Sequence, residues 1–359
     1  MLFHGPGRPL EVAEVELEGP RAGEVLVRMA AVGVCGTDLH QFKGDWRCPT
    51  PMVLGHEGSG VVEEVGSAVR GLAPGDEVVL SWAPSCRECA DCRRGRPAAC
   101  VPLNRAIGAG TLVDGTTGLS LRGETVYRGT ATGCLAERVV VSAHVALPTG
   151  GAVPLREAAL LGCAALTGVG AVLFAARVTP GSSVLVIGAG GVGQFIVQGA
   201  RIAGAEAIVA VDPFDGRREQ ALRLGATHAV APDELKEALK EILPAGADYA
   251  FDAVGDPATS ATALRFVRSG GTVVIVGLPA AGLRLDLDPA EFIRKEKLLT
   301  GTLYGSEDPA VALPVLLEHV RAGRLRLQEL LGPTYPLEQV NEAFAASLAG
   351  SPGRVIVAP

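Results

Sequence analysis

The sequence predicts an α/β protein in two parts, a mostly β part and a doubly wound parallel sheet of six strands. Up to about residue 164, short apolar runs alternate with turns rich in Gly and Pro, which is typical of short strands. From about 165 to 304, apolar strand patterns alternate with helical patterns, as in strands joined by crossover helices. A chain of 359 residues is long enough for two domains of ordinary size.

In the first part, the predicted strands are EVLVRMAAVGV, MVLG, GVVEEV, EVVLSW and AERVVVS. The uncharged stretch at 158–176 approaches the length of a membrane span. Its content of Ala and Gly, and its position just before a strand, favour a buried pair of helix segments instead.

In the second part, the predicted strands are SVLVIG, AIVAVD, ATHAV, DYAFDAV, GTVVIVG and KLLTGTLY. The predicted helices between them are VGQFIVQGARIAG, GRREQALRLG, ELKEALKEIL and PATSATALRFVRSG. The remainder, 305–359, is helical in pattern and ends in a strand, GRVIVAP.

A glycine motif joins the first of these strands to the first helix. It comprises Gly188, Gly190, Gly191, Val192 and Gly193. Such glycines let the backbone approach a pyrophosphate at a helix N-terminus, and an acid at the end of the next strand binds the ribose. Asp212 stands at that acid's place, nineteen residues beyond Gly193. The pattern predicts a Rossmann dinucleotide site; the alternative is a glycine-rich turn in an ordinary βαβ unit.

Asp212 also favours NAD over NADP as the cofactor, because a carboxylate repels a 2′-phosphate. Arg217 and Arg218 follow closely and could tolerate a phosphate.

Four cysteines form a local group with the spacing C-x2-C-x2-C-x7-C: Cys86, Cys89, Cys92 and Cys100. Four thiolates this close in sequence can converge on one tetrahedral ion, so we expect a structural zinc lobe at about 84–101. Disulfides or unrelated thiols are the alternatives. The flanking residues are polar and carry Gly and Pro, which suits a lobe without a core of its own.

A second group combines Cys35, His56 of the sequence GHE, and Cys163. Two thiolates and one imidazole form a three-ligand zinc site with an open fourth position. Catalytic zinc needs such an open position, where it can act as a Lewis acid. Each residue alone is more often a buried core residue. The remaining cysteines, Cys48 and Cys134, are interpreted as free thiols.

With these motifs in this order, the chain resembles the zinc-dependent alcohol dehydrogenases of the medium-chain dehydrogenase/reductase superfamily. The match runs from GEVLVRMAAVGVCGTDLH to VNEAFAASLAGSPGRVIV. The resemblance implies a GroES-like catalytic domain over 1–164, a Rossmann NAD-binding domain over 165–304, and a return to the catalytic domain over 305–359. It also implies two zinc ions per chain.

The resemblance further implies a proton route through Thr37 and His40, since hydroxyl and imidazole can both accept and donate a proton. Asp38 would hydrogen-bond the ligand His56. Glu57 would be a transient zinc ligand or act only through its charge. The remaining cofactor contacts implied are Arg217 at the ribose, Arg354 at the pyrophosphate, and Val192, Val276, Leu278 and Leu303 around the nicotinamide.

Gly36 departs from the family pattern, because many relatives carry a basic residue there against the pyrophosphate. Its absence should weaken the hold on the cofactor.

Trp46 and Trp82 match positions that face the family's substrate channel. Two indoles would narrow the channel and offer apolar faces, so we expect primary alcohols with an apolar or aryl tail. The alternative is that both side chains only pack within the domain.

The sequence also resembles proteins with other functions, or allows a function without catalysis. Polyol dehydrogenases are similar but generally have Glu where Cys163 stands. Thiol-dependent formaldehyde dehydrogenases share the long segment 104–133, and Arg105 could meet a carboxylate, one residue out of their register. A nucleotide-sensing protein without turnover is disfavoured by the Thr37 and His40 pair.

The net charge of −7, without a long basic block, argues against nucleic acid or acidic membranes as partners. No apolar signal segment begins the sequence, so a cytoplasmic location is expected. The segment between Cys100 and Cys163 has the length that dimeric relatives retain, which predicts a homodimer paired through sheet edges.

Overall fold

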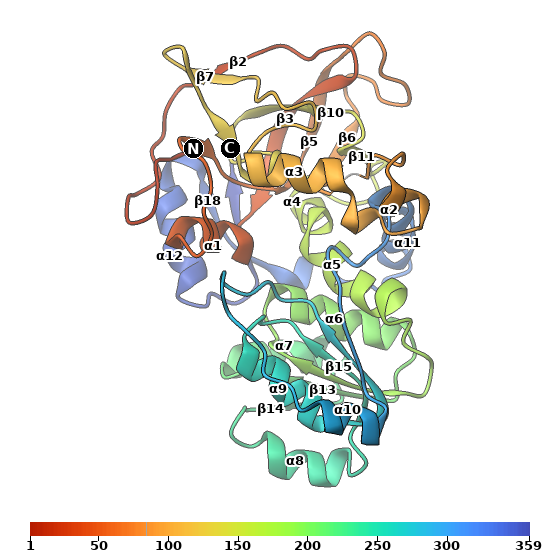
Figure 1. Cartoon of the computed structure of the whole chain (residues 1–359). Coiled ribbons are helices and arrows are strands. Elements are labelled where there is room, and N and C mark those ends of the chain that lie inside the picture. The colour runs from red at the N-terminus through yellow and green to blue at the C-terminus, as the bar shows by residue number, and fades with distance from the viewer. Residues whose placement is uncertain (84) are drawn as a thin grey trace. The chain divides into compact units, whose positions relative to one another are not determined.

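The computed structural model describes residues 1–83 and 85–359 (Figure 1). The chain divides into two compact units. The first unit comprises Met1–Ala164, Asp308–Arg321 and Leu327–Pro359, and the second comprises Ala165–Glu307 and Ala322–Arg326. The chain therefore re-enters the first unit at Asp308, three residues later than the sequence predicts, and 322–326 lie with the second unit.

The first unit is built on a seven-stranded sheet of order β11-β6-β5-β3-β19-β18, with β10 also paired to β3. Its strands are β3 (Glu24–Gly33), β5 (Glu57–Val65), β6 (Glu77–Leu80), β10 (Arg138–Ser142), β11 (Ala146–Pro148), β18 (Leu331–Pro336) and β19 (Arg354–Ala358). The C-terminal strand β19 runs antiparallel to β3, so the end of the chain completes the sheet of the first part.

The edge strand β18 was not predicted from the sequence. Its residues, LGPTYP, include Gly and two Pro, and Pro is tolerated mainly on sheet edges. It pairs in parallel with β19. This pairing, rather than a strand pattern in its own sequence, accounts for the strand.

Two three-stranded sheets complete the β structure of this unit. One consists of β1 (Leu2–Phe3), β4 (Met52–Val53) and β9 (Tyr127–Arg128). The other consists of β2 (Glu16–Leu17), β7 (Leu119–Leu121) and β8 (Glu124–Thr125).

Most helices of the first unit are short, and α11 is the longest. They are α1 (Gly36–Lys43), α2 (Ala90–Arg93), α3 (Val101–Ala109), α4 (Leu155–Ala158), α11 (Pro309–Arg321) and α12 (Val340–Leu348). Alternate residues of β3, such as Val25 and Val27, are buried in the same core as Val340 and Phe344 of α12. Because apolar residues alternate along β3, one face of the strand supplies this core.

The pairing of β3 with β5 positions the site. Gly33, the last residue of β3, lies opposite Glu57, the first residue of β5. Cys35 follows the one strand and His56 precedes the other, so the antiparallel register brings these two residues to the same end of the sheet.

The second unit contains the six-stranded parallel sheet that the sequence predicts, in the order β14-β13-β12-β15-β16-β17. Its strands are β12 (Ser183–Ile187), β13 (Ala207–Val211), β14 (His228–Val230), β15 (Ala247–Asp252), β16 (Val267–Ile275) and β17 (Leu298–Gly301). This is the doubly wound order, in which ligands bind beyond the carboxyl ends of the central strands.

The helices of this unit include α5 (Ala164–Gly170), α6 (Gly191–Ile202), α7 (Asp215–Leu224), α8 (Leu235–Ile242), α9 (Pro257–Phe266) and α10 (Pro289–Lys295). Helix α9 is shorter than predicted because β16 begins directly at Val267. Helix α10 was not predicted; Asp288 caps it by accepting a hydrogen bond from the Ala290 N–H, and Pro289 opens its first turn.

Among the described residues, no single helix is long and apolar enough to cross a membrane. One bent pair, Leu155–Gly162 with Ala164–Ala175, passes that test by length and composition only. Residues 158–172 of this pair are all buried within the protein, as the sequence predicts.

Candidate functional site

Cys35, His56 and Cys163 meet in the first unit. One ligand atom from each lies within 4.8 Å of the others, and the two sulfur atoms are 3.9 Å apart. All three residues are buried, with exposures of 7%, 1% and 5%. Cys35 precedes α1, His56 precedes β5, and Cys163 follows the 3₁₀ turn Ala159–Gly162. Three element ends thus converge on one point.

This group fits a zinc ion. A tetrahedral ion with Zn–S bonds of about 2.3 Å separates two sulfur ligands by roughly 3.8 Å. The hydrogen bond with Cys163, followed by the charges of Arg354 and His56, holds the pKa of the Cys35 thiol well below its usual value despite burial. The thiolate, which is the form that binds metal, is therefore favoured at Cys35, whereas the hydrogen bond with Cys35 and burial raise the pKa of the Cys163 thiol well above its usual value.

Asp38 positions Cys35 and His56 through hydrogen bonds. Its Oδ1 accepts hydrogen bonds from His56 Nδ1 and from the Gly55 backbone N–H, both at 3.1 Å, and its Oδ2 accepts from the Cys35 N–H at 3.0 Å. Burial lowers the pKa of His56, but the charges of Asp38 and Cys35 outweigh it and raise that pKa well above its usual value. Because Nδ1 is engaged, Nε2 is the ring atom left for a metal.

Glu57 and Arg354 form a buried ion pair beside this group. Arg354 Nε and Nη2 donate to the two carboxylate oxygens of Glu57, each at 2.9 Å, and Nη1 donates to the Val34 carbonyl at 3.2 Å. Burial raises the pKa of Glu57 to about 7, although Arg354 opposes this. Arg354, which the resemblance assigns to a pyrophosphate, is thus also the counterion of Glu57, and its Nη2 lies 3.8 Å from Cys35 Sγ.

His40 lies on α1 and is oriented by two neighbours. Its Nδ1 is 2.6 Å from Asp45 Oδ2, and its ring stacks on Trp46 with centroids 4.7 Å apart. Asp45 was not predicted from the sequence. The available signal was Gly44, which ends α1 in the left-handed conformation and turns Asp45 back toward His40. Thr37, in the first turn of α1, is half-buried.

Trp82 lies two residues beyond β6 and is 8% exposed. Its ring meets the His56 ring edge to face, with centroids 6.0 Å apart. The two tryptophans of the chain therefore each contact a histidine of the predicted site, Trp46 at His40 and Trp82 at His56.

The four cysteines at 86–100 also converge, with one ligand atom of each within 4.8 Å of the others. Cys92 Sγ lies 3.8 Å from Cys86 Sγ and 3.4 Å from Cys89 Sγ, near the sulfur separation of a tetrahedral zinc site. Cys100 is buried and the other three are half-buried. A backbone hydrogen bond at Cys92 is the main cause that lowers the pKa of Cys89 to about 6. Cys48 and Cys134 lie outside both groups.

The glycine motif forms the N-terminus of α6 in the second unit. Gly190 caps the helix, Gly188 has φ of 89°, and a Cβ at Gly193 would overlap the Gly188 carbonyl oxygen. Close packing of strand and helix therefore requires glycine at this point.

Asp212, just after β13, is 2% exposed. Its Oδ2 accepts from the Ala189 N–H at 2.9 Å and its Oδ1 from the Phe214 N–H at 3.0 Å. Arg217 Nη1 lies 3.7 Å from the same carboxylate. These residues, with Gly188 and Gly190, line a cavity of about 520 Å³, large enough for an adenosine moiety. The cavity also includes Thr259 and Thr262 of α9, which no sequence motif indicated.

The remaining predicted cofactor contacts also lie in the second unit. Val276 is buried, Val192 and Leu303 are half-buried, and Leu278 is exposed.

Comparison with known proteins identifies the family of the chain. Residues 21–151 match the family described as "Alcohol dehydrogenase GroES-like domain", and residues 191–318 match "Zinc-binding dehydrogenase". The chain is 39% identical over 349 residues to an NDMA-dependent alcohol dehydrogenase of Amycolatopsis methanolica, covering 96% of this chain and 94% of the relative. It is 34% identical to an S-(hydroxymethyl)glutathione dehydrogenase of Escherichia coli, covering 98% and 97%.

Among solved structures, the crystal structure of benzyl alcohol dehydrogenase from Acinetobacter calcoaceticus is similar with a TM-score of 0.93 and 31% identity, over 99% of this chain and 97% of that one. These matches confirm the predicted fold and the predicted enzyme class, and membership implies zinc and NAD. The chain is an oxidoreductase that acts on small alcohols, and it belongs to the zinc-dependent alcohol dehydrogenases of the medium-chain dehydrogenase/reductase superfamily.

Proposed function

We propose that the protein oxidises primary alcohols with an apolar or aryl tail to aldehydes, with NAD and a zinc ion held by Cys35, His56 and Cys163. The observation that carries the proposal is the convergence of these three buried ligand atoms within 4.8 Å of one another. When bound, zinc supplies a Lewis acid for the alcohol oxygen and NAD accepts the hydride.

The residues of the chain supply geometry and a path for the proton. Asp38 fixes the plane and the tautomer of the His56 ring through Nδ1, which leaves Nε2 as the atom that would bind the metal. Thr37 can take a proton on its hydroxyl and pass one on. His40 holds Nδ1 against Asp45, which leaves Nε2 to receive the proton, and its side chain is 27% exposed.

The test is a panel of alcohols assayed by the absorbance of reduced cofactor. We expect benzyl and medium-chain primary alcohols to have higher specificity constants than polyols or bulky secondary alcohols. Trp82→Ala should change this ranking, because its indole borders the metal group. A uniform loss with the ranking unchanged would assign Trp82 to the scaffold.

The cofactor proposed is NAD, because Asp212 places a carboxylate in the adenosine cavity. Asp212→Gly should raise the use of NADP relative to NAD by removing the clash with a 2′-phosphate. Equal use of both cofactors by the wild type would contradict this proposal.

Two zinc ions per chain are proposed, since the two groups of ligands share no residue. Elemental analysis should give two per chain, and one per chain would overturn the separate structural site.

A second candidate substrate class is the S-hydroxymethyl adduct of a small thiol. It is favoured by the 34% identity to S-(hydroxymethyl)glutathione dehydrogenase and by Arg105, which is exposed on α3 where a carboxylate could reach it. The panel therefore includes formaldehyde with candidate thiols. It also includes NDMA as an acceptor, because one relative is named for its dependence on it.

A homodimer is proposed through the edge strand β17 of the second unit. Leu298 on this strand is 60% exposed and Ile293 on α10 is 79% exposed, an apolar edge of the kind that a second copy covers. Light scattering that reports a tetramer or a monomer would refute it.

A further inference from the structure

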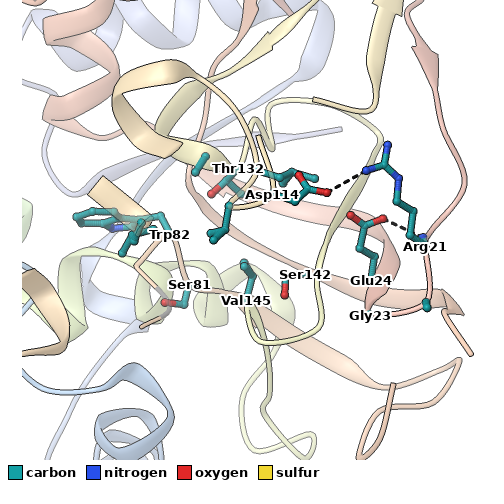
Figure 2. A pocket seen from close by; sticks show the side chains of 14 residues that line it. Arg21, Gly23, Glu24, Ser81, Trp82, Asp114, Thr132, Ser142 and Val145 are labelled. Atoms are coloured by element: carbon teal, nitrogen blue, oxygen red, sulfur yellow. Dashed lines mark hydrogen bonds and ion pairs between the residues drawn. The ribbon is translucent and has the colours of Figure 1, made fainter. Parts of the chain in front are cut away.

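A cavity of about 450 Å³ lies in the first unit behind Trp82 (Figure 2). None of Cys35, His56 or Cys163 lines it. Its inner end is buried and mostly apolar, formed by Trp82, Leu103, Leu112, Ala131 and Val145. Its opposite end is exposed at Arg21, Ala22, Gly23, Val113 and Asp114. The cavity is thus open at a charged rim and closed by an indole.

One wall of this cavity contains strained backbone. Thr130 and Ala131 both have positive φ, 52° and 55°, which is unusual for residues with a Cβ and clusters at functional sites. The fully buried Arg128 fixes this segment by donating from Nε to the Thr117 carbonyl and from Nη1 to the Thr132 carbonyl.

Burial lowers the pKa of Arg128 to about 10, so its guanidinium stays charged at neutral pH. Its Nη2 has no hydrogen-bond partner among the residues that the structure describes.

The charges at the rim select among ligands. Arg21 is already neutralised, because its two guanidinium nitrogens contact Glu18 at 2.8 Å and Asp114 at 2.9 Å. Figure 2 shows Glu24 and Asp114 beside Arg21 at the end away from Trp82. Among the lining residues, one positive charge (Arg21) and two negative charges (Glu24 and Asp114) leave a net charge of −1, which disfavours an anion.

We propose that this cavity binds a small aryl or alkyl molecule with one uncharged or cationic head group, an alcohol or an amine, with its apolar body against Trp82. The size and the apolar lining suit such a body, and the hydroxyls of Thr132 and Ser142 lie along the path to the carboxylates. The ligand class includes the alcohols of the proposed function, so this would be a second alcohol site.

Trp82 connects the cavity to the metal group. Trp82 lines the cavity, and its ring also meets the His56 ring, with centroids 6.0 Å apart and the two planes nearly perpendicular. A ligand that presses on Trp82 therefore changes the packing of a zinc ligand. This coupling, unlike the binding itself, rests on the proposed function.

Binding is tested with 4-bromobenzyl alcohol in crystals of the metal-loaded protein, where anomalous scattering locates the bromine. We expect a bromine peak between Trp82 and Glu24. Bromine found only elsewhere would overturn the proposal. Calorimetry in solution should show benzyl alcohol and benzylamine bound at least about tenfold more tightly than benzoate, and tighter binding of benzoate would equally contradict it.

Two matched variants separate this cavity from the metal site. Val113→Phe narrows the rim, where Val113 is 48% exposed, whereas Val12→Phe makes the same change at a side chain 54% exposed that does not line the cavity. Val113→Phe should weaken cavity binding about tenfold or more, and Val12→Phe should leave it unchanged. Equal binding by both variants and the wild type would refute the site.

Turnover provides the test of coupling. At rising benzyl alcohol concentration, the rate should show a second phase that Val12→Phe retains and Val113→Phe loses. Absence of that phase in an active enzyme overturns the coupling. If no alcohol is oxidised, the proposed function fails, while the bromine position still decides whether the cavity is a binding site.

Discussion

The buried group of Cys35, His56 and Cys163 draws on segments up to 128 residues apart, whereas the four cysteines of the lobe lie within fifteen residues. All three residues of the first group are buried, but three of the lobe cysteines are half-buried. Helix α2, between Cys89 and Arg94, buries no residue at all. Similar sulfur separations are thus reached in two different settings.

This contrast concerns whether the protein fold or the bound metal positions the ligands of each group. The register of β3 with β5 and the Asp38 hydrogen bonds bring Cys35 and His56 together through contacts within the protein itself. The lobe has few apolar residues to hold its shape, so the proposal of a second zinc assigns its stability to metal bonds. Loss of a ligand should therefore lower turnover at the first group and lower the free energy of unfolding at the second.

The largest effect is expected from Cys163→Ala. It removes one of three buried ligands, so turnover should fall by about a thousandfold or more, while the melting temperature stays near that of the wild type. Steady-state kinetics, thermal unfolding and elemental analysis should give an inactive, folded protein with one zinc. Cys134→Ala is the matched control, because Cys134 is equally buried but outside both groups, and it should retain turnover.

Cys89→Ala tests the opposite half of the comparison. Loss of a lobe ligand should cost about 3 kcal/mol or more of unfolding free energy, which lowers the melting temperature by roughly 6–12 °C. Cys48→Ala, at a half-buried thiol outside both groups, should leave it unchanged. If Cys89→Ala lost turnover at full stability, the roles assigned to the two groups would be reversed.

Asp38→Asn sharpens the contrast within the buried group. The amide keeps an oxygen for His56 Nδ1 or for the backbone N–H groups but loses the charge that raises the pKa of His56. Zinc affinity at this group should fall about 10- to 100-fold, with the lobe unaffected. Competition with a chelator should show one weakened zinc per chain. Weakening of both would mean that the two groups are not independent.

The sequence indicates those parts of the protein whose signals are local. The six strands of the second sheet follow from their apolar runs, and the lobe follows from cysteine spacing. The glycine motif with Asp212 is equally local. The buried group needed a resemblance to known enzymes as well, because nothing in the spacing of Cys35 and Cys163 requires them to meet.

Features set by tertiary pairing escaped prediction. Strand β18 has no apolar alternation and exists because β19 lies beside it. Arg128 is fully buried although its residue type predicts exposure, and only the folded chain shows that its guanidinium ties 117 to 132. The residues that line the cavity behind Trp82 are spread from 21 to 145, so no single stretch of sequence predicts it.

The smallest effect is expected where the lobe is tied to the rest of the first unit. Asp308 Oδ2 accepts a hydrogen bond from Ser85 Oγ at 3.0 Å and lies 3.3 Å from Arg87 Nε, while Oδ1 accepts from the Ala310 N–H at the start of α11. Asp308→Asn keeps a good helix cap but removes the charge that faces Arg87. Arg87 is 61% exposed, so solvent screens the pair and the cost should be only about 0.5–1 kcal/mol.

That cost corresponds to a drop of roughly 1–4 °C in the melting temperature of the zinc-loaded protein. A chelator should also remove the lobe zinc faster from Asp308→Asn than from the wild type, because the lobe opens more often once this tether is weakened. Zinc at Cys35, His56 and Cys163 should leave at an unchanged rate. A loss as large as that of Cys89→Ala would show that protein contacts, rather than the metal, hold the lobe in place, and the contrast between the two groups would fail.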